Sequence, residues 1–191
     1  MAENQNWNDR VGKEHMSDLS PKGIPVMLDG VERDFLFTLS CIDEIQSETG
    51  KPIQTAVRDI LKSDAAGDGL AALVTILINR GSDQSGQTRI TKTEVEESIT
   101  EENRYSVMLA VLEAYARSLP EPDEFDTGNA KENEESDKLN IARLLYIGAM
   151  KMGYTEKEIF AMTPRKFFLI YDQFLEINGL KEKEVTVADI F

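Results

Sequence analysis

Near the start of the chain, apolar residues occupy every second position and then give way to helical spacing. Residues 24–28 alternate in this way, and a second alternating run follows Asp29-Gly30. Asp-Gly favours a two-residue type I′ turn, because both central residues of that turn need a positive φ. The pattern predicts a short β-hairpin within residues 24–38. Pro25 cannot donate a backbone hydrogen bond, which places the hairpin at an edge or outside a large sheet.

The rest of the chain shows the three- and four-residue apolar spacing of helices. Gly67-Asp68-Gly69 is interpreted as a turn, Gly81 as the end of the helix that follows it, and Gly81 to Arg89 as a polar loop. The helix between these glycines is apolar almost all round and is expected to be the most buried of the first half. We expect helices over residues 39–49, 53–61, 70–80, 92–99, 103–119, 139–152, 156–162 and 164–178.

Helix starts are marked by three local signals. Thr91 with Glu94 and Thr155 with Glu158 have the spacing of capping boxes, in which side chains satisfy amides at the helix N-terminus. Thr163-Pro164 combines an N-cap residue with proline at the first helical position. In the helix over 103–119, one face is expected to carry Tyr105, Met108, Leu112, Tyr115 and Leu119.

An acidic stretch divides the chain. Between Pro120 and Asp137 there are eight acidic residues, one basic residue and two apolar residues. Such a segment cannot offset its ordering entropy by burial, so it is expected to be a disordered linker. The fold class predicted is mainly α, with a short N-terminal β-hairpin, a helical domain, the linker and a small helical module. The corresponding ranges are 1–23 (a mobile tail), 24–119, 120–137 and 138–191.

Charge and composition restrict the partners. The 191 residues carry a net charge of -14, whereas nucleic-acid binding draws on Lys and Arg that displace counterions from phosphates. No apolar run approaches the roughly 20 residues that span a bilayer. Cys41 is the only cysteine, so no intramolecular disulfide forms. The sequence predicts a cytosolic protein that binds neither nucleic acid nor membrane.

The residues of common catalytic and metal sites are scarce. The only histidine, His15, lies in the polar N-terminal tail, and Cys41 is close to Asp43 and Glu44, which disfavour a reactive thiolate. Zinc sites need more Cys and His than the chain contains. No phosphate-binding glycine motif occurs, and the acidic stretch lacks EF-hand spacing. We expect no catalytic, cofactor or metal site; unfamiliar carboxylate chemistry is the enzymatic alternative.

An aromatic stripe near the C-terminus has two interpretations. It is an ordinary core face that packs on Leu144, Leu145 and Gly148, or it is part of a groove that binds a partner. A module of this size cannot bury all of its large apolar residues, which keeps the second interpretation open. The stripe consists of Phe167, Phe168, Tyr171 and Phe174.

Two regions of the sequence resemble the tail assembly chaperones of long-tailed bacteriophages. The first runs from Val26-Met-Leu-Asp-Gly-Val-Glu-Arg33 through residues 35–39 to Ile42-Asp-Glu-Ile-Gln-Ser-Glu-Thr-Gly50. The second is the segment over 145–168, with Thr155-Glu-Lys-Glu158 and Met162-Thr-Pro164 before an aromatic helix. Together with the acidic stretch between them, the resemblance covers roughly residues 24–178.

The resemblance implies a role in assembly. In this family a short form coats the tape measure protein, and a longer form, made by ribosomal frameshifting, adds a module that recruits tail tube subunits. The present chain resembles the long form, although an unfused gene with a permanent extension gives the same protein. The implied partners are the tape measure protein and the tail tube protein, with self-association on the tape measure. The implied location is the host cytoplasm and not the mature virion.

A contact site for the tail tube subunit is expected around Tyr154, Arg165, Phe168 and Tyr171. Arg165 and Lys166 open the last helix, where the helix dipole makes basic residues mildly unfavourable, so a carboxylate from a partner would offset that effect. Phe168 and Tyr171 are neighbours on the helix surface. The alternatives for the whole chain are other acidic helical interaction proteins, such as a virion connector subunit or a regulatory adaptor.

Overall fold

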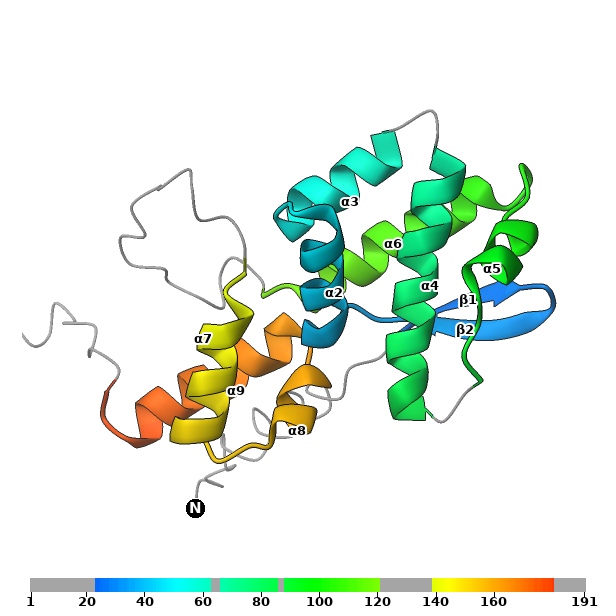
Figure 1. Cartoon of the computed structure of the whole chain (residues 1–191). Coiled ribbons are helices and arrows are strands. Elements are labelled where there is room, and N and C mark those ends of the chain that lie inside the picture. The colour runs from blue at the N-terminus through cyan, green and yellow to red at the C-terminus, as the bar shows by residue number, and fades with distance from the viewer. Residues whose placement is uncertain (1–22, 63–65, 86–87, 121–138, 181–191) are drawn as a thin grey trace, which may run out of the picture.

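The computed structural model describes residues 23–62, 66–85, 88–120 and 139–180 (Figure 1). The expected N-terminal tail, apart from Gly23, and the expected linker, apart from Pro120, lie outside these ranges. The described part is mainly helical with one N-terminal hairpin, which confirms the fold class. Its elements are β1 (Ile24–Leu28), β2 (Val31–Phe35), α2 (Leu39–Thr49), α3 (Ile53–Lys62), α4 (Ala66–Ser85), α5 (Lys92–Ser98), α6 (Arg104–Ser118), α7 (Ile141–Tyr146), η2 (Ile147–Lys151), α8 (Glu156–Phe160) and α9 (Pro164–Ile177).

The hairpin forms where the alternating pattern predicts it. β1 and β2 are antiparallel, with Ile24 opposite Phe35 at one end and Leu28 opposite Val31 at the other. Asp29 and Gly30 have φ of 49° and 74°, as a type I′ turn requires. Ile24, Leu28 and Phe35 are buried, so one face of the hairpin contributes to the core.

Helix α4 corrects the prediction around its glycines. Gly67 to Gly69 lie in its first turn rather than in a separate turn, and the helix continues through Gly81 to Ser85. The predicted polar loop from Gly81 therefore starts too early. A glycine weakens a helix by about 1 kcal/mol relative to alanine. Burial of the side chains between the glycines outweighs that loss, because Leu70, Leu73 and Leu77 are at most 1% exposed. The expectation of a deeply buried helix is confirmed.

Helix α6 turns a different face inward than its large apolar residues suggest. Its buried residues are small or β-branched: Val107, Ala110, Val111, Ala114 and Ser118. Tyr105 and Leu112, which the sequence places on the expected apolar face, are exposed. On that face, Tyr115 is half-buried, with its ring edge-to-face with Phe37 at 5.4 Å between centroids. The helix thus packs with one apolar face and exposes another.

The C-terminal helices pack around Gly148. A Cβ at this position would lie 2.6 Å from Ile159 Cδ1 and 3.2 Å from Phe167 Cε2, so only glycine permits this approach. Gly148 belongs to η2, a π-helical turn that continues α7 where the sequence predicts a regular α-helix. The buried ring of Phe167 confirms the core interpretation for that residue of the aromatic stripe.

The local helix signals are confirmed. Both capping boxes are formed, at Thr91 with Glu94 and at Thr155 with Glu158. Thr163 caps α9 by accepting from the Lys166 N–H, with Pro164 at the first helical position.

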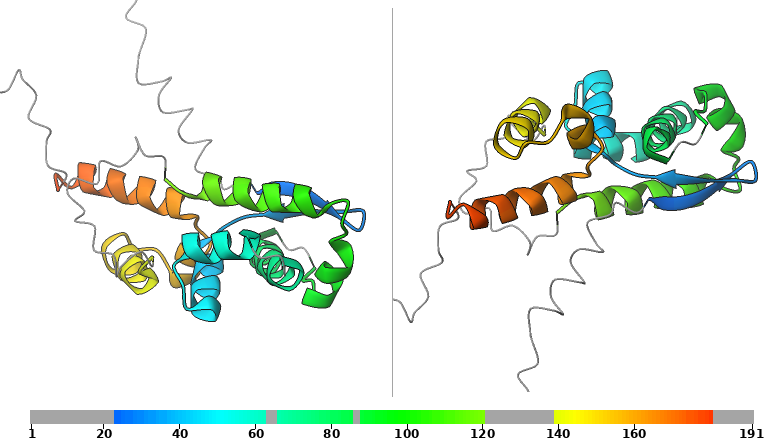
Figure 2. Two further views of the ribbon diagram at one scale, coloured as in Figure 1. Left: turned by 90° about the horizontal axis from the view of Figure 1, so that it is seen from above. Right: turned by 90° about the horizontal axis from the view of Figure 1, so that it is seen from below.

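The hairpin lies between α4 and α6, and α9 continues in line with α6 along one side of the molecule (Figure 2). Residues 139–180 pack against α2, where the Leu39 N–H donates to the Met162 carbonyl at 2.8 Å. Buried residues from both halves, including Ile42 and Phe167, belong to one hydrophobic cluster. The division into separate domains over 24–119 and 138–191 stays a prediction.

Candidate functional site

A cleft lies between α2, α4 and the end of α8. Its volume is about 640 Å³, and it is lined by Ser40, Asp43, Glu44, Arg80, Lys157, Phe160 and Ala161. On α2 the lining residues are three and four positions apart, and the same spacing recurs from Lys157 to Ala161. Each helix therefore presents one face to the cleft. The cleft unites residues from the two regions that the sequence analysis treats as separate modules.

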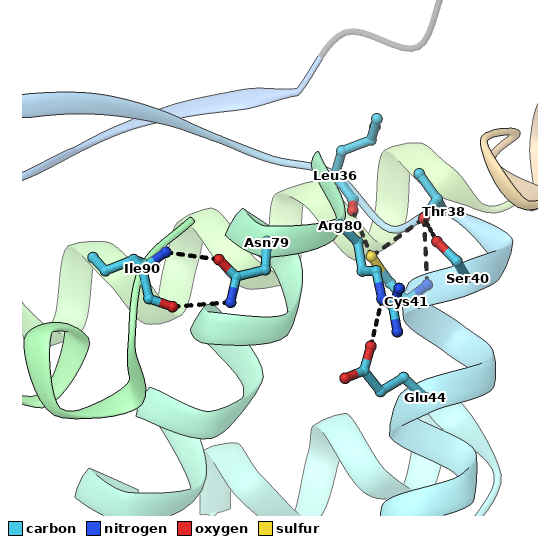
Figure 3. Close-up of polar contacts among 8 residues, drawn as sticks. All are labelled: Leu36, Thr38, Ser40, Cys41, Glu44, Asn79, Arg80 and Ile90. Carbon is cyan, nitrogen blue, oxygen red and sulfur yellow. Dashed lines mark hydrogen bonds and ion pairs between the residues drawn. The ribbon is translucent and has the colours of Figure 1, made fainter. Parts of the chain in front are cut away.

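An ion pair between α2 and α4 forms one wall of the cleft. Arg80 Nε lies 2.6 Å from Glu44 Oε2, and both side chains are about one-third exposed. Arg80 and Glu44 also line a smaller cavity of about 140 Å³, together with Asn79 and Arg89. The Asn79 side chain donates to and accepts from the backbone of Ile90 at 2.9 and 2.8 Å, which fastens α4 to the chain that enters α5 (Figure 3).

The first turn of α2 holds a compact polar network beside the cleft (Figure 3). Thr38 Oγ1 accepts from the Cys41 N–H at 3.3 Å and is 2.8 Å from Ser40 Oγ. Cys41 Sγ–H donates to the Leu36 carbonyl at 3.3 Å. Burial raises the pKa of the Cys41 thiol to about 11, against hydrogen bonds from Thr38 that lower it. At neutral pH this group is therefore a buried thiol and not a thiolate nucleophile.

The cleft combines two acidic residues, two basic residues and the half-buried ring of Phe160. This arrangement suits binding of a mixed polar and apolar segment. Among the described residues, no three His, Cys, Asp or Glu side chains are grouped to hold a metal ion. His15 lies outside the described ranges. The expectations of no catalytic residue and no cofactor stay predictions.

The four residues of the expected tail tube site are all half-buried. Phe168 and Tyr171 both contact the ring of Phe167, at centroid distances of 5.8 and 6.5 Å. Arg165 lies on the first turn of the same helix. Tyr154 lies in the loop before α8, where its N–H donates to the Gly148 carbonyl at 3.0 Å. The structure thus groups Phe168 and Tyr171 around one buried ring, and their role in binding stays a prediction.

A second candidate surface, absent from the expected site, is the outward face of α6. Tyr105, Leu109 and Leu112 are 69%, 48% and 45% exposed. Their spacing of four and three residues places them on one face of the helix. We call this row of three side chains the α6 stripe. The signal in the sequence is that large apolar residues occupy one face of the helix while valine and alanine occupy the other.

Further exposed apolar side chains occur in the C-terminal region: Tyr146, Met150 and Ile177 in its helices, and Leu180 after the end of α9. Tyr146 and Met150 are four residues apart, across the junction of α7 and η2.

No helix within the described ranges combines the length and the apolarity that crossing a bilayer requires. In comparisons with known protein families, curated proteins and solved structures, the chain matches none of them.

Proposed function

We propose that this protein is a non-enzymatic tail assembly chaperone of a long-tailed bacteriophage. In this role it keeps the tape measure protein soluble and recruits tail tube subunits while the tail is built. The proposal rests on the sequence resemblance, and the α6 stripe is the structural observation that supports it most directly.

The α6 stripe supports a role in binding apolar helices. Leu109 and Leu112 lie on the outward face, whereas Ala110 and Ala114 lie on the packed face of the same helix. Large apolar side chains on the outer surface add no buried apolar area to the folded monomer. A partner helix, however, can pack against them, because they recur at helical spacing. The tape measure protein implied by the resemblance is long, helical and apolar before its tube forms.

The charge of the chain supports the same role. A net charge of -14 opposes aggregation of the complex while apolar surfaces are engaged. Segment 24–119 binds the tape measure protein. Segment 139–180 binds the tail tube subunit through Tyr154, Arg165, Phe168 and Tyr171. Copies of the chain associate along the tape measure. The complex forms in the host cytoplasm, and the chaperone is absent from the mature virion.

Co-expression tests this function. The whole chain should raise the soluble fraction of a tape measure protein that is insoluble alone. An unchanged soluble fraction would remove the main support for the proposal.

The cleft between α2, α4 and α8 favours a second candidate, an adaptor or virion connector that holds a peptide segment of its partner. Mass spectrometry of purified particles separates the two roles. A connector subunit would be found in the particles, whereas a chaperone would be missing.

A further inference from the structure

We infer that, in the free protein, the α6 stripe is covered by the α6 stripe of a second copy, packed antiparallel in a two-fold symmetric dimer. The dimer rests on the spacing and the charge of α6 and of the turn before it. Its consequence for the tape measure rests on the proposed function.

The spacing along α6 fits a helix as the occupant. Tyr105, Leu109, Leu112 and the exposed Ala116 follow one another at intervals of four, three and four residues. This is the spacing of the apolar seam in a coiled coil, whose side chains interdigitate with those of a facing helix. The seam occupies most of a helix of 15 residues, about 22 Å long.

The position of α6 leaves the seam accessible. In both views of Figure 2, α6 lies at the margin of the molecule, with the hairpin on its inner side. Val107, Val111 and Ala114 face the core and are at most 3% exposed. The seam therefore lies on the side turned away from the described part of the chain.

The opposite charges near the two ends of α6 favour a second copy of the chain as the partner, in antiparallel orientation. A two-fold axis midway between Tyr105 and Leu112 places the start of one helix opposite the end of the other. Glu102 then comes to face the turn that carries Arg117 of the second copy. Both residues are exposed, and Glu102 lies in the turn just before α6, three residues before Tyr105. The symmetry forms this pair twice.

Arg117 can make this contact without losing its present one. Its Nη2 lies 2.5 Å from Glu113 Oε1 in the same helix. A guanidinium has five N–H donors in a fork, so further donors remain for a carboxylate of the second copy. A parallel dimer would instead bring Arg117 beside Arg117, which is repulsive.

The dimer is expected to be weak and reversible. The seam holds few side chains, and two copies that each carry a charge of -14 repel one another. Weak self-association fits the proposed function, because the second copy covers the stripe until a longer apolar helix of the tape measure protein displaces it. Dimerisation through the α6 stripe and binding of the tape measure protein then compete for one surface.

Sedimentation equilibrium of the purified whole chain, without any partner, tests the dimer. We expect an equilibrium between monomer and dimer that shifts towards dimer as the protein concentration rises. Its dissociation constant should be below roughly 1 mM, which is weak for a protein complex. Leu109→Glu should abolish the dimer, and Met150→Glu, on another exposed apolar residue, should leave it unchanged. A chain that stays monomeric, or a dimer that both variants leave intact, overturns the inference.

Charge exchange tests the orientation. Arg117→Glu alone and Glu102→Arg alone should each weaken the dimer about five- to tenfold, and the double variant should restore it. Circular dichroism checks that each variant is folded. A double variant weaker than both single variants contradicts the pairing.

Disulfide trapping gives an independent readout in a Cys41→Ala background. Leu109→Cys lies close to the two-fold axis and should cross-link readily. Ala116→Cys should not, because its two copies lie about 20 Å apart along an antiparallel pair. Equal cross-linking at both positions would indicate a parallel dimer and overturn the inference. None of these measurements uses the tape measure protein, so failure of the dimer and failure of the proposed function are distinguishable.

Discussion

Gln46 on α2 and Leu139, 93 residues later in the chain, are joined by two hydrogen bonds. The Gln46 side-chain amide donates to the Leu139 carbonyl at 3.1 Å, and its carbonyl oxygen accepts from the Leu139 N–H at 3.0 Å. Gln46 is only 8% exposed. The pair fixes the start of the C-terminal segment against α2, about two helical turns along α2 from the contact between Leu39 and Met162.

Gln46→Leu should destabilise the whole chain by about 1–3 kcal/mol. The substitution keeps the size of the side chain but removes the acceptor of the Leu139 N–H, and a buried donor without a partner is costly. The Leu139 carbonyl keeps the Ile141 N–H, which donates to it at 3.0 Å. Urea unfolding followed by circular dichroism measures the change. Gln54→Leu, at an exposed position on α3, is the matched control and should stay within about 0.5 kcal/mol. Equal effects of the two variants would mean that the Gln46 contact adds nothing.

Gly148→Ala should destabilise the fold by about 1–3 kcal/mol, the usual range for overpacking. The added Cβ would lie 2.6 Å from Ile159 Cδ1, and Ile159 is fully buried. Gly69→Ala in α4 is the control, because its nearest neighbour would be Ile60 at 3.6 Å. We expect that change to stabilise the protein by about 0.5–1 kcal/mol.

A double-mutant cycle identifies the cause. In an Ile159→Ala background, Gly148→Ala should lose most of its effect. An undiminished effect would show that contact with Phe167 Cε2, at 3.2 Å, and not contact with Ile159, requires glycine.

The Cys41 thiol should make stability depend on pH in the alkaline range. Burial raises its pKa from about 9 to about 11, so between these values the unfolded chain releases a proton that the folded chain keeps. Stability is then fully present below about pH 9 and falls as pH rises towards 11, by about 3 kcal/mol in total.

Cys41→Ala provides the comparison for that pH dependence. Burial also raises the pKa of Tyr115, which acts in the same direction in both proteins. The slope of unfolding free energy between pH 9 and 11 should therefore be shallower in the variant. Identical slopes would contradict a buried, protonated Cys41.

The parts of the fold that depend on residues adjacent in the sequence could be predicted from the sequence alone. The Asp29-Gly30 turn, the boxes at Thr91 and Thr155 and the start at Thr163-Pro164 each need only a few adjacent residues. Features set by distant contacts could not be predicted. The π-helical turn at Gly148 depends on the packing of Ile159 and Phe167, and the cleft depends on α2 meeting α4 and α8.

The inward face of α6 shows why apolar spacing alone was insufficient. The face expected from the spacing carries Tyr105 and Leu112, which are larger than Ala110 and Ala114 and would bury more surface. The structure buries the small ones, where α6 packs on the hairpin and on α9. The same inversion leaves the α6 stripe exposed. The likeness to tail assembly chaperones did not indicate this surface either.

Arg165→Glu should weaken capture of the tail tube subunit without unfolding the protein. The partner carboxylate expected at the start of α9 would then meet a negative charge. Arg143→Glu, an exposed residue of α7, carries the same change of charge and should bind normally. Pull-down with purified tube subunit measures both, and equal binding by the two variants would remove Arg165 from the site.

Phe168→Ala and Tyr171→Ala test the aromatic part of that site. Both rings are half-buried against Phe167, so each truncation should lower stability by less than the roughly 3–5 kcal/mol of a fully buried ring. Thermal melting establishes which variants remain folded. Folded variants that bind the tube subunit as well as the original protein would assign these rings to packing alone.

The most direct measurement of the central claim is the soluble fraction of the tape measure protein, co-expressed with variants of the whole chain. The original protein and Met150→Glu should keep most of the tape measure protein in solution. Leu109→Glu should lose that effect although it remains folded, because it places a charge in the middle of the α6 stripe. A tape measure protein that stays equally soluble with Leu109→Glu, or stays insoluble with the original protein, would contradict the account.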